Sequence, residues 1–335
     1  MSYASSTFRA AQVLLDGGRE GGNMPIITRN GWELPESELT PAGFSLGRRR
    51  LLESALGGAV GAGLLGGAAS ADVPVQNALR FDPGRPVTPE KTVFTYNNYY
   101  EFGSQKSIWR AAQRLRMSPW SLTIDGLVKK PFTIALSDLI RRMPIEQRIY
   151  RHRCVEAWAM TVPWQGFALS HLVKLAEPLG SAKYLAFTTV EQKANMPGLA
   201  ESWYPWPYRE GVTMAEATNE LAFLATGLYG MPLKPQNGGP IRLVLPWKYG
   251  FKSAKSLIRI SFVEKKPPTF WSVIAPNEYG FWANVNPAVP HPRWSQAYER
   301  LIGTNQRVPT RIYNGYGKWV AALYAGMPKS IWLYR

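Results

Sequence analysis

Cys154 is the single cysteine among 335 residues, and it lies in the segment Y-R-H-R-C-V-E-A-W at positions 150–158. A lone cysteine can be an inert core residue, a nucleophile or a metal ligand. Neighbouring positive charge stabilises the thiolate, which is the form that attacks electrophiles and binds metals. Arg151, His152 and Arg153 precede the cysteine, although a period-two strand would turn both arginines away from the sulfur. The segment alone leaves all three possibilities open.

Metal centres built from protein ligands alone fit this chain poorly. It has three histidines, His152, His171 and His291, and they are widely spaced. Structural zinc needs about four Cys or His ligands in short spacings. There is no C-x-x-C-H motif for haem attachment, and iron–sulfur clusters need several cysteines. A metal bound by Cys154 would therefore take its other ligands from outside the polypeptide.

A second candidate site is the segment L-P-W-K-Y-G-F-K-S-A-K-S at 245–256, where an apolar strand opens into a loop with three lysines. Backbone amides and the point charges of Lys248, Lys252 and Lys255 suit a phosphate. The P-loop pattern is missing, so this is no nucleotide-binding loop of that kind. The alternative is a solvated lysine loop.

Two further segments contain groups that recognise ligands. Arg242 follows Asn237 and a Gly-Gly turn and lies inside an apolar strand, where a buried guanidinium needs an anionic partner. The alternative places Arg242 on a wet face of the strand. Residues 96–102, Y-N-N-Y-Y-E-F, combine amides, phenols and a carboxylate. Such groups recognise the edge of a heterocycle, and they also occur in ordinary turns.

The first 71 residues carry the pattern of an export signal. An arginine run at 48–50 precedes a weakly apolar stretch at 51–68 that is mostly Gly, Ala and Leu. The stretch ends in a small-x-small cleavage pattern, so cleavage is expected between Ala71 and Asp72. Consecutive arginines before a Gly-rich core are typical of the twin-arginine route, which exports folded proteins and predicts a periplasmic location.

The alternative to a cleaved signal is a membrane anchor, which Glu53 and the many glycines of this stretch disfavour. Residues 1–44 are long for the region before an arginine pair. Met24 is therefore a candidate initiator beside Met1.

The part of the chain after residue 71 carries the whole net charge of +16, and this charge limits the kinds of ligand and partner to expect. The basic residues are dispersed, and the chain has no zinc-finger spacing or RNA-binding aromatic signature, so nucleic acid is an unlikely ligand. An anionic cofactor and a membrane-associated partner fit the charge better.

The predicted organisation is an N-terminal extension with its signal at 1–71, a Pro-rich tether at 72–92 and a catalytic domain at 93–335. Within the domain, short strands and short helices alternate without strict βα order, which indicates an α+β fold. We expect these strands: 120–128, 183–190, 221–228, 240–246 and 256–263, with a strand-to-loop segment at 149–158. We expect these helices: 104–117, 133–143, 170–176 and 213–221. Asn314-Gly315 is typical of a hairpin turn.

Taken together, these segments resemble the bacterial protein-methionine-sulfoxide reductase catalytic subunits, molybdoenzymes of the sulfite oxidase fold. The motifs that carry the resemblance are Y-N-N at 96–98 with Y-E-F at 100–102, R-C-V-E-A-W at 153–158, M-P-G at 196–198, P-Q-N-G at 235–238, V-L-P-W-K-Y-G-F-K at 244–252, Y-G-F-W-A-N-V-N-P at 279–287 and H-P-R-W-S-Q at 291–296. They span nearly all of residues 90–320.

The resemblance implies a molybdenum-molybdopterin cofactor, with Cys154 as the protein thiolate on the metal. It implies these cofactor contacts: Asn97, Tyr100, Glu101, Thr189, Asn237, Arg242, Ser253, Ala254 and Lys255. The contacts at Ser253 and Ala254 would be mainly through the backbone, and His152 is given no role.

The resemblance also implies an activity and partners. The enzyme would reduce methionine sulfoxide in oxidised periplasmic proteins, with electrons from a haem-binding membrane subunit fed by quinol. Larger sulfite oxidases carry a further C-terminal dimerisation domain for which this chain is too short. A monomeric catalytic subunit that forms a heterodimer with its electron donor is therefore expected.

Three alternatives remain for the function. A sulfite oxidase, or another S- or N-oxide reductase, would share the fold and cofactor. A Cys-His hydrolase would be metal-free, and a basic binding module would show neither metal nor turnover. Thiol-based sulfoxide reductases are disfavoured because the chain has no resolving cysteine.

Overall fold

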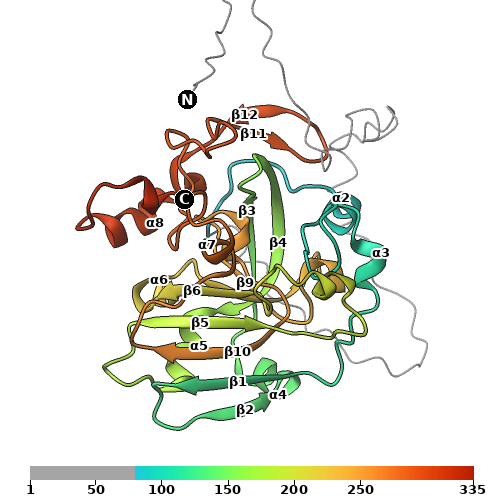
Figure 1. Cartoon of the computed structure of the whole chain (residues 1–335), viewed down its shortest axis with the longest axis vertical. Coiled ribbons are helices and arrows are strands. Elements are labelled where there is room, and N and C mark those ends of the chain that lie inside the picture. The colour runs from blue at the N-terminus through green and yellow to red at the C-terminus, as the bar shows by residue number, and fades with distance from the viewer. Residues whose placement is uncertain (1–79) are drawn as a thin grey trace, which may run out of the picture. The chain divides into compact units, whose positions relative to one another are not determined.

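The computed structural model describes residues 80–335 (Figure 1). The predicted export signal, its cleavage site and the first part of the predicted tether lie outside this range. In the described range, no helix is both long and apolar enough to cross a membrane.

One sheet has five strands in the order β2-β1-β10-β5-β6. Its strands are β1 (Ser121–Gly126), β2 (Phe132–Ala135), β5 (Tyr184–Thr189), β6 (Arg209–Thr213) and β10 (Leu257–Val263). β1 and β10 run parallel, and the other neighbours are antiparallel. Buried and more exposed residues alternate along β1 and β5, as the sequence pattern predicts for strands with one face on the core.

The other sheet is built around the long central strand β4 (Trp158–Ala168), whose residues are almost all buried. β4 pairs with β3 (Glu146–Arg153), β7 (Phe223–Leu228) and β11 (Tyr298–Leu301). β12 (Arg307–Pro309) extends the sheet beyond β11, and β8 (Met231–Pro232) and β9 (Arg242–Val244) both pair with β7. β3 ends at Arg153, directly before Cys154, and β9 begins at Arg242, so both residues lie at this sheet.

The helices are short. They are α2 (Glu90–Thr95), α3 (Trp109–Ala112), α4 (Leu136–Arg142), α5 (Leu169–Ala176), α6 (Met214–Thr218), α7 (Phe270–Ile274) and α8 (Gly317–Val320). Single 3₁₀ turns link other elements: η3 (Pro197–Ala200), η4 (Pro235–Asn237), η5 (Gly250–Lys252), η6 (Ile312–Gly315), η7 (Ala321–Tyr324) and η8 (Ile331–Leu333). Short helices between mixed strands confirm the α+β class.

Three local predictions need correction. The expected helix at 104–117 is confined to α3, and residues 133–143 divide into β2 and α4 because Phe132–Ala135 pairs with β1. The expected hairpin at Asn314-Gly315 is a 3₁₀ turn instead. The amide of Asn314 donates to the Pro246 carbonyl 2.8 Å away, so a tertiary contact takes the place of strand pairing there.

The folded part includes residues that the sequence assigns to the tether. The ring of Phe81 is buried against Tyr150 and Trp319. The guanidinium of Arg85 pairs with Glu299 and donates to the Thr161 hydroxyl 2.7 Å away. The packed domain therefore extends back to at least Phe81 rather than beginning at residue 93.

Candidate active site

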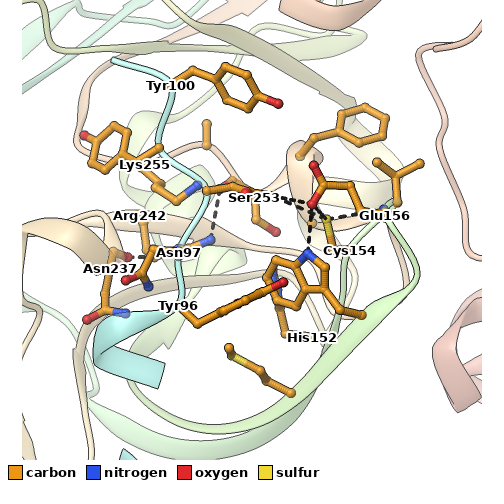
Figure 2. Close-up of a pocket in the computed structure, with 18 of the residues that line it drawn as sticks. Tyr96, Asn97, Tyr100, His152, Cys154, Glu156, Asn237, Arg242, Ser253 and Lys255 are labelled. Atoms are coloured by element: carbon orange, nitrogen blue, oxygen red, sulfur yellow. Dashed lines mark hydrogen bonds between the residues drawn. The ribbon is translucent and has the colours of Figure 1, made fainter. Parts of the chain in front are cut away.

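One pocket collects most of the residues singled out from the sequence (Figure 2). Its walls come from α2 and the turn that follows, the β3–β4 connection, η4, β9 and the loop after η5. Its empty volume is about 970 Å³, part of which is open to solvent. Figure 2 shows two ends, with Arg242, Lys255, Asn97 and Asn237 at one and Cys154 beside Glu156 at the other.

Cys154 follows the last residue of β3, in the tight connection to β4. Its N–H donates to the Trp158 carbonyl at 2.9 Å, and Ala157 closes the turn with a φ of 64°. The thiol is buried yet lines the pocket. Burial, followed by the charge of Glu156, raises the pKa of Cys154 to about 12, so the metal-free thiol stays protonated.

The arginines beside Cys154 do not stabilise its thiolate by contact. Arg153 pairs with Glu299 at 3.0 Å, and the Nε of Arg151 donates to the Pro83 carbonyl at 2.5 Å. Both point away from the sulfur, as expected for alternating strand residues. The charges of Lys106 and Arg153 do lower the pKa of Cys154, as expected of positive neighbours acting at a distance, but burial outweighs them in the metal-free protein. A bound cation is what would deprotonate this sulfur.

The sulfur lies in a polar network that the sequence analysis left without a role. The Glu156 carboxylate accepts from the Trp158 indole at 2.9 Å and from the Asn98 amide at 3.2 Å, and it pairs with Lys106 at 2.5 Å. The Cys154 thiol points to the same carboxylate oxygen at 3.8 Å. Burial alone would raise the pKa of Glu156, but Lys106 and the hydrogen bonds lower it, so the group is a carboxylate.

Arg242 is buried, which contradicts the wet-face alternative. Its guanidinium lies over the Trp164 ring and donates to the carbonyls of Asn237 (2.9 Å) and Ser253 (3.1 Å). Among residues 80–335, no carboxylate forms an ion pair with it. Burial lowers the pKa of Arg242 to about 10, which leaves a cation that lacks a protein counter-ion.

Lys255 and Glu101 lie in the same part of the pocket. Burial, followed by the charge of Arg242, lowers the pKa of Lys255, whereas burial raises the pKa of Glu101. Thr189 lies behind the pocket wall, where its hydroxyl donates to Glu101 Oε1 at 3.5 Å. Thr189 therefore does not line the pocket itself but contacts Glu101, which does.

Two asparagines present acceptors that have no partner. The amide nitrogens of Asn97 and Asn237 both donate to the Val93 carbonyl at 2.9 Å. Their Oδ1 atoms are buried and accept no hydrogen bond from the described residues. Buried acceptors of this kind need a donor, so they fit the donor-bearing edge of a heterocycle.

The remaining predicted contacts also lie at this pocket. Tyr100 packs its ring edge-on against Tyr204 and Trp271. Ser253 and Ala254 are buried lining residues, and the Ser253 hydroxyl accepts from the Leu245 N–H at 3.1 Å. The hydroxyl is thus engaged in holding the loop, which agrees with the expectation that this loop acts mainly through its backbone.

Two of the three loop lysines are not phosphate ligands. Lys248 forms a buried ion pair with Glu216 at 2.5 Å, and Lys252 forms another with Glu210. Both lysines are fully buried and lie outside the pocket lining. The predicted phosphate role is therefore wrong for Lys248 and Lys252, because each neutralises a buried glutamate. Lys255 alone faces the pocket.

His152, to which the sequence analysis gave no role, lies in the pocket wall. Burial, followed by the charge of Arg242, lowers the pKa of His152 to about 3, so the ring is neutral. Gly250 packs against it closely enough that a Cβ at Gly250 would lie 2.7 Å from the ring. Among residues 80–335, no three His, Cys, Asp or Glu side chains gather as a metal site.

Comparisons with known proteins give this pocket a chemical identity. The family profile "Oxidoreductase molybdopterin binding domain" matches residues 110–271. The protein-methionine-sulfoxide reductase catalytic subunit MsrP of Ralstonia nicotianae is 48% identical over 316 residues, covering 89% of this chain and 95% of that protein. Its Burkholderia mallei counterpart is 47% identical over 313 residues, with the same coverage.

The chain belongs to the family of protein-methionine-sulfoxide reductase catalytic subunits. It is therefore a molybdopterin-dependent oxidoreductase, as the resemblance implied. Among solved structures, the sulfane dehydrogenase SoxCD of Paracoccus pantotrophus aligns with a TM-score of 0.41 and 17% identity, over 60% of this chain and 56% of that chain.

The pocket fits the cofactor that the family implies. Arg242 is a buried cation and Lys255 a partly buried one, and both are suited to a phosphate. The free Oδ1 atoms of Asn97 and Asn237 are acceptors suited to a pterin edge. Cys154 supplies the soft sulfur ligand that molybdenum-type sites accept, at the opposite end of the pocket. The charge, acceptor and thiol requirements are therefore all met by residues that face one cavity.

Proposed function

We propose that the protein reduces methionine sulfoxide residues in oxidised exported proteins to methionine. The observation that carries the proposal is one cavity with the Cys154 thiol at one end and, at the other, Lys255 and the buried Arg242, which forms no ion pair with a carboxylate of residues 80–335 (Figure 2). The relatives MsrP of Ralstonia nicotianae and of Burkholderia mallei, named as protein-methionine-sulfoxide reductases, supply the substrate class. Methionine sulfoxide is a common oxidative lesion, so a repair enzyme has an abundant substrate.

The residues of the chain hold and orient the cofactor. Cys154 would ligate the molybdenum, and Arg242 and Lys255 would bind the phosphate of molybdopterin. Asn97 and Asn237 would accept hydrogen bonds from the pterin. Tyr100, Glu101 with Thr189 behind it, and the Ser253–Ala254 loop would complete the enclosure. When bound, the molybdenum supplies the two-electron chemistry, in which the sulfoxide, two electrons and two protons become a thioether and water.

Electrons would come from a haem-binding membrane subunit fed by quinol. The relatives are named as catalytic subunits, which supports a heterodimer of a monomeric catalytic chain and a donor. The net charge of +16 favours docking beside an anionic membrane surface. The arginine run at 48–50 and the cleavage pattern before Asp72 support twin-arginine export to the periplasm.

The test is metal analysis and turnover of the protein produced in a host that makes molybdenum cofactor. We expect about one molybdenum per chain, and reduction of methionine sulfoxide in an oxidised test protein with reduced viologen as donor. Cys154→Ser should alter the metal's absorption spectrum and abolish turnover. Arg259→Met, at an exposed position of β10, is the control that should change neither.

The alternatives give different results in the same assays. Oxidation of sulfite, or reduction of small S- or N-oxides without activity on oxidised protein, would replace the proposed substrate. A well-folded, metal-free protein that hydrolyses esters and is blocked by thiol alkylation would point to the Cys-His hydrolase. Neither metal nor turnover would leave a basic binding module.

A further inference from the structure

The ion pair between Lys106 and Glu156 bears on which substrates can reach the sulfur end of the pocket. The two side chains meet at 2.5 Å, and both are mostly shielded from solvent. Glu156 is a lining residue, and its carboxylate oxygen faces the Cys154 sulfur at 3.8 Å. The negative charge of Glu156, which is paired with Lys106, therefore lies directly beside Cys154, the proposed metal ligand.

The carboxylate is held in place from several sides. Trp158 and Asn98 donate to it, and the Asn98 amide also reaches the Cys154 sulfur at 3.5 Å. The Glu156 N–H points to the same sulfur at 3.5 Å. Because its position is set by these donors, Glu156 cannot turn away from an incoming ligand without breaking them.

The two ends of the pocket differ in charge as a result. Arg242 and Lys255 form the cationic end, which the cofactor phosphate would neutralise. At the sulfur end, Glu156 lines the pocket, whereas its partner Lys106 is not among the lining residues. A neutral dipole such as a sulfoxide is scarcely repelled by the Glu156 carboxylate, whereas an anion is repelled by its negative charge.

We propose that the Lys106–Glu156 pair is a specificity device that admits neutral S-oxides to the metal and repels oxyanions such as sulfite and sulfate. The inference rests on the proposed function, since it assumes that substrate oxygen is exchanged beside Cys154. Glu156 acts as the repelling charge, and its ion pair with Lys106 helps to hold the carboxylate beside Cys154.

The test measures sulfate affinity of the molybdenum-loaded protein, with dimethyl sulfoxide as the neutral ligand. Binding is followed by quenching of tryptophan fluorescence, because Trp158 and Trp271 line the pocket. Glu156→Gln leaves Lys106 unpaired and should tighten sulfate binding by about tenfold or more relative to dimethyl sulfoxide. Arg259→Met removes a positive charge at an exposed position of β10 outside the pocket, so sulfate affinity should stay at the wild-type level.

A second variant keeps the proposal testable if Glu156→Gln fails to retain molybdenum. Lys106→Gln, at a partly exposed position, leaves the carboxylate uncompensated and should weaken sulfate binding below wild type. The double variant Lys106→Gln/Glu156→Gln should bind sulfate between the two single variants. Unchanged sulfate affinity in both single variants, or an equal change in Arg259→Met, would overturn the proposal.

The proposed function fails by a different result. If the wild-type protein retains molybdenum but does not reduce methionine sulfoxide, the substrate assignment is wrong whatever the sulfate affinities. If it reduces methionine sulfoxide while Glu156→Gln gains no sulfate affinity, the activity stands and the specificity device is wrong.

Discussion

The guanidinium of Arg153 and the carboxylate of Glu299 meet at 3.0 Å inside the domain, with both side chains almost wholly buried. Arg153 also donates to the carbonyl of Cys154 and to Gln296 Oε1 at 2.8 Å. The pair therefore joins the end of β3 to β11 and holds the backbone of the proposed metal ligand.

Replacement of Glu299 by Gln should be strongly destabilising. The change leaves Arg153, and Arg85 beside it, without their shared counter-ion. We expect the free energy of unfolding to fall by about 3 kcal/mol or more, because one partner of a buried pair is removed. Urea denaturation of the metal-free protein measures it.

The matched control is Glu264→Gln, which breaks the exposed pair with Lys183 at 3.3 Å. Exposed pairs contribute little to stability, so the urea midpoint should scarcely move. Equal midpoints for the two variants would contradict a structural role for the Arg153–Glu299 pair.

A variant at Lys252 tests whether this lysine is structural or binds phosphate. Lys252→Met should lower the free energy of unfolding by about 3 kcal/mol, because Glu210 is left as a buried charge without a partner. The double variant Lys252→Met/Glu210→Met should recover part of this loss. The molybdenum content per folded chain should remain near one in both, as measured by metal analysis after gel filtration. A stable Lys252→Met protein without molybdenum would restore the phosphate role.

Arg242 should show the opposite behaviour. Arg242→Met removes a buried cation that forms no ion pair with a carboxylate of residues 80–335, but it also removes hydrogen bonds to the Asn237 and Ser253 carbonyls. The two effects oppose each other, so the stability of the metal-free protein should stay within about 1 kcal/mol of wild type. Cofactor retention should fall by about tenfold or more, since a charge-assisted contact to the phosphate is lost. Thermal unfolding and molybdenum analysis of the same preparation test both statements. Large destabilisation with normal molybdenum content would make Arg242 a structural residue.

The sequence predicts the strands of this domain well because burial alternates along them. β1, β5 and β10 lie within the expected ranges 120–128, 183–190 and 256–263. The helix at 104–117 is shorter than expected because only the Trp109–Ala112 stretch forms a continuous turn. Local patterning cannot decide such cases, since tertiary contacts compete with a weak helix preference.

The residues of the pocket were predictable from the family motifs, but their electrostatics were not. The partner of Lys252 is 42 positions away in the sequence, and Lys248 pairs with Glu216 across a similar gap. No local pattern distinguishes these lysines from Lys255, because only the tertiary pairing neutralises them. Glu156 lies two residues after Cys154, within one of the family motifs. Nothing in the sequence singles it out, because the donors that surround its carboxylate come together only in the folded domain.

Gly198 shows why the M-P-G motif needs a glycine. A Cβ at this position would lie 2.0 Å from the Tyr100 carbonyl oxygen, and the Gly198 N–H donates to the Glu101 carbonyl at 2.8 Å. Gly198→Ala should displace the Tyr100–Glu101 turn, lower the free energy of unfolding by about 1–3 kcal/mol and reduce cofactor retention. Gly180→Ala, where nothing lies within 4 Å of the added carbon, is the control. Similar melting temperatures for both variants would show that the turn can move aside.

His291 should make the stability of the domain depend on pH. Burial, followed by the charges of Arg293 and Arg335, lowers the pKa of His291 from 6.5 to about 4. Glu278 lies 3.4 Å away but is already paired with Arg293 at 2.8 Å, so it does little to hold a proton on the ring. In the unfolded chain the imidazole titrates normally, so below pH 6.5 the unfolded state binds more protons than the folded state.

The stabilising effect of neutral His291 is therefore complete above pH 6.5 and is lost as the pH falls toward 4. We expect the loss to reach about 2 kcal/mol at pH 4.5 relative to pH 7.5. His291→Gln cannot take up the proton, so the difference between wild type and variant isolates this group from the other titrating residues. Urea denaturation at several pH values gives the energies, and the NMR titration of the ring protons gives the pKa. A ring that titrates near 6.5, or an equal pH dependence in both proteins, would mean that the folded domain accepts the proton at His291 without cost.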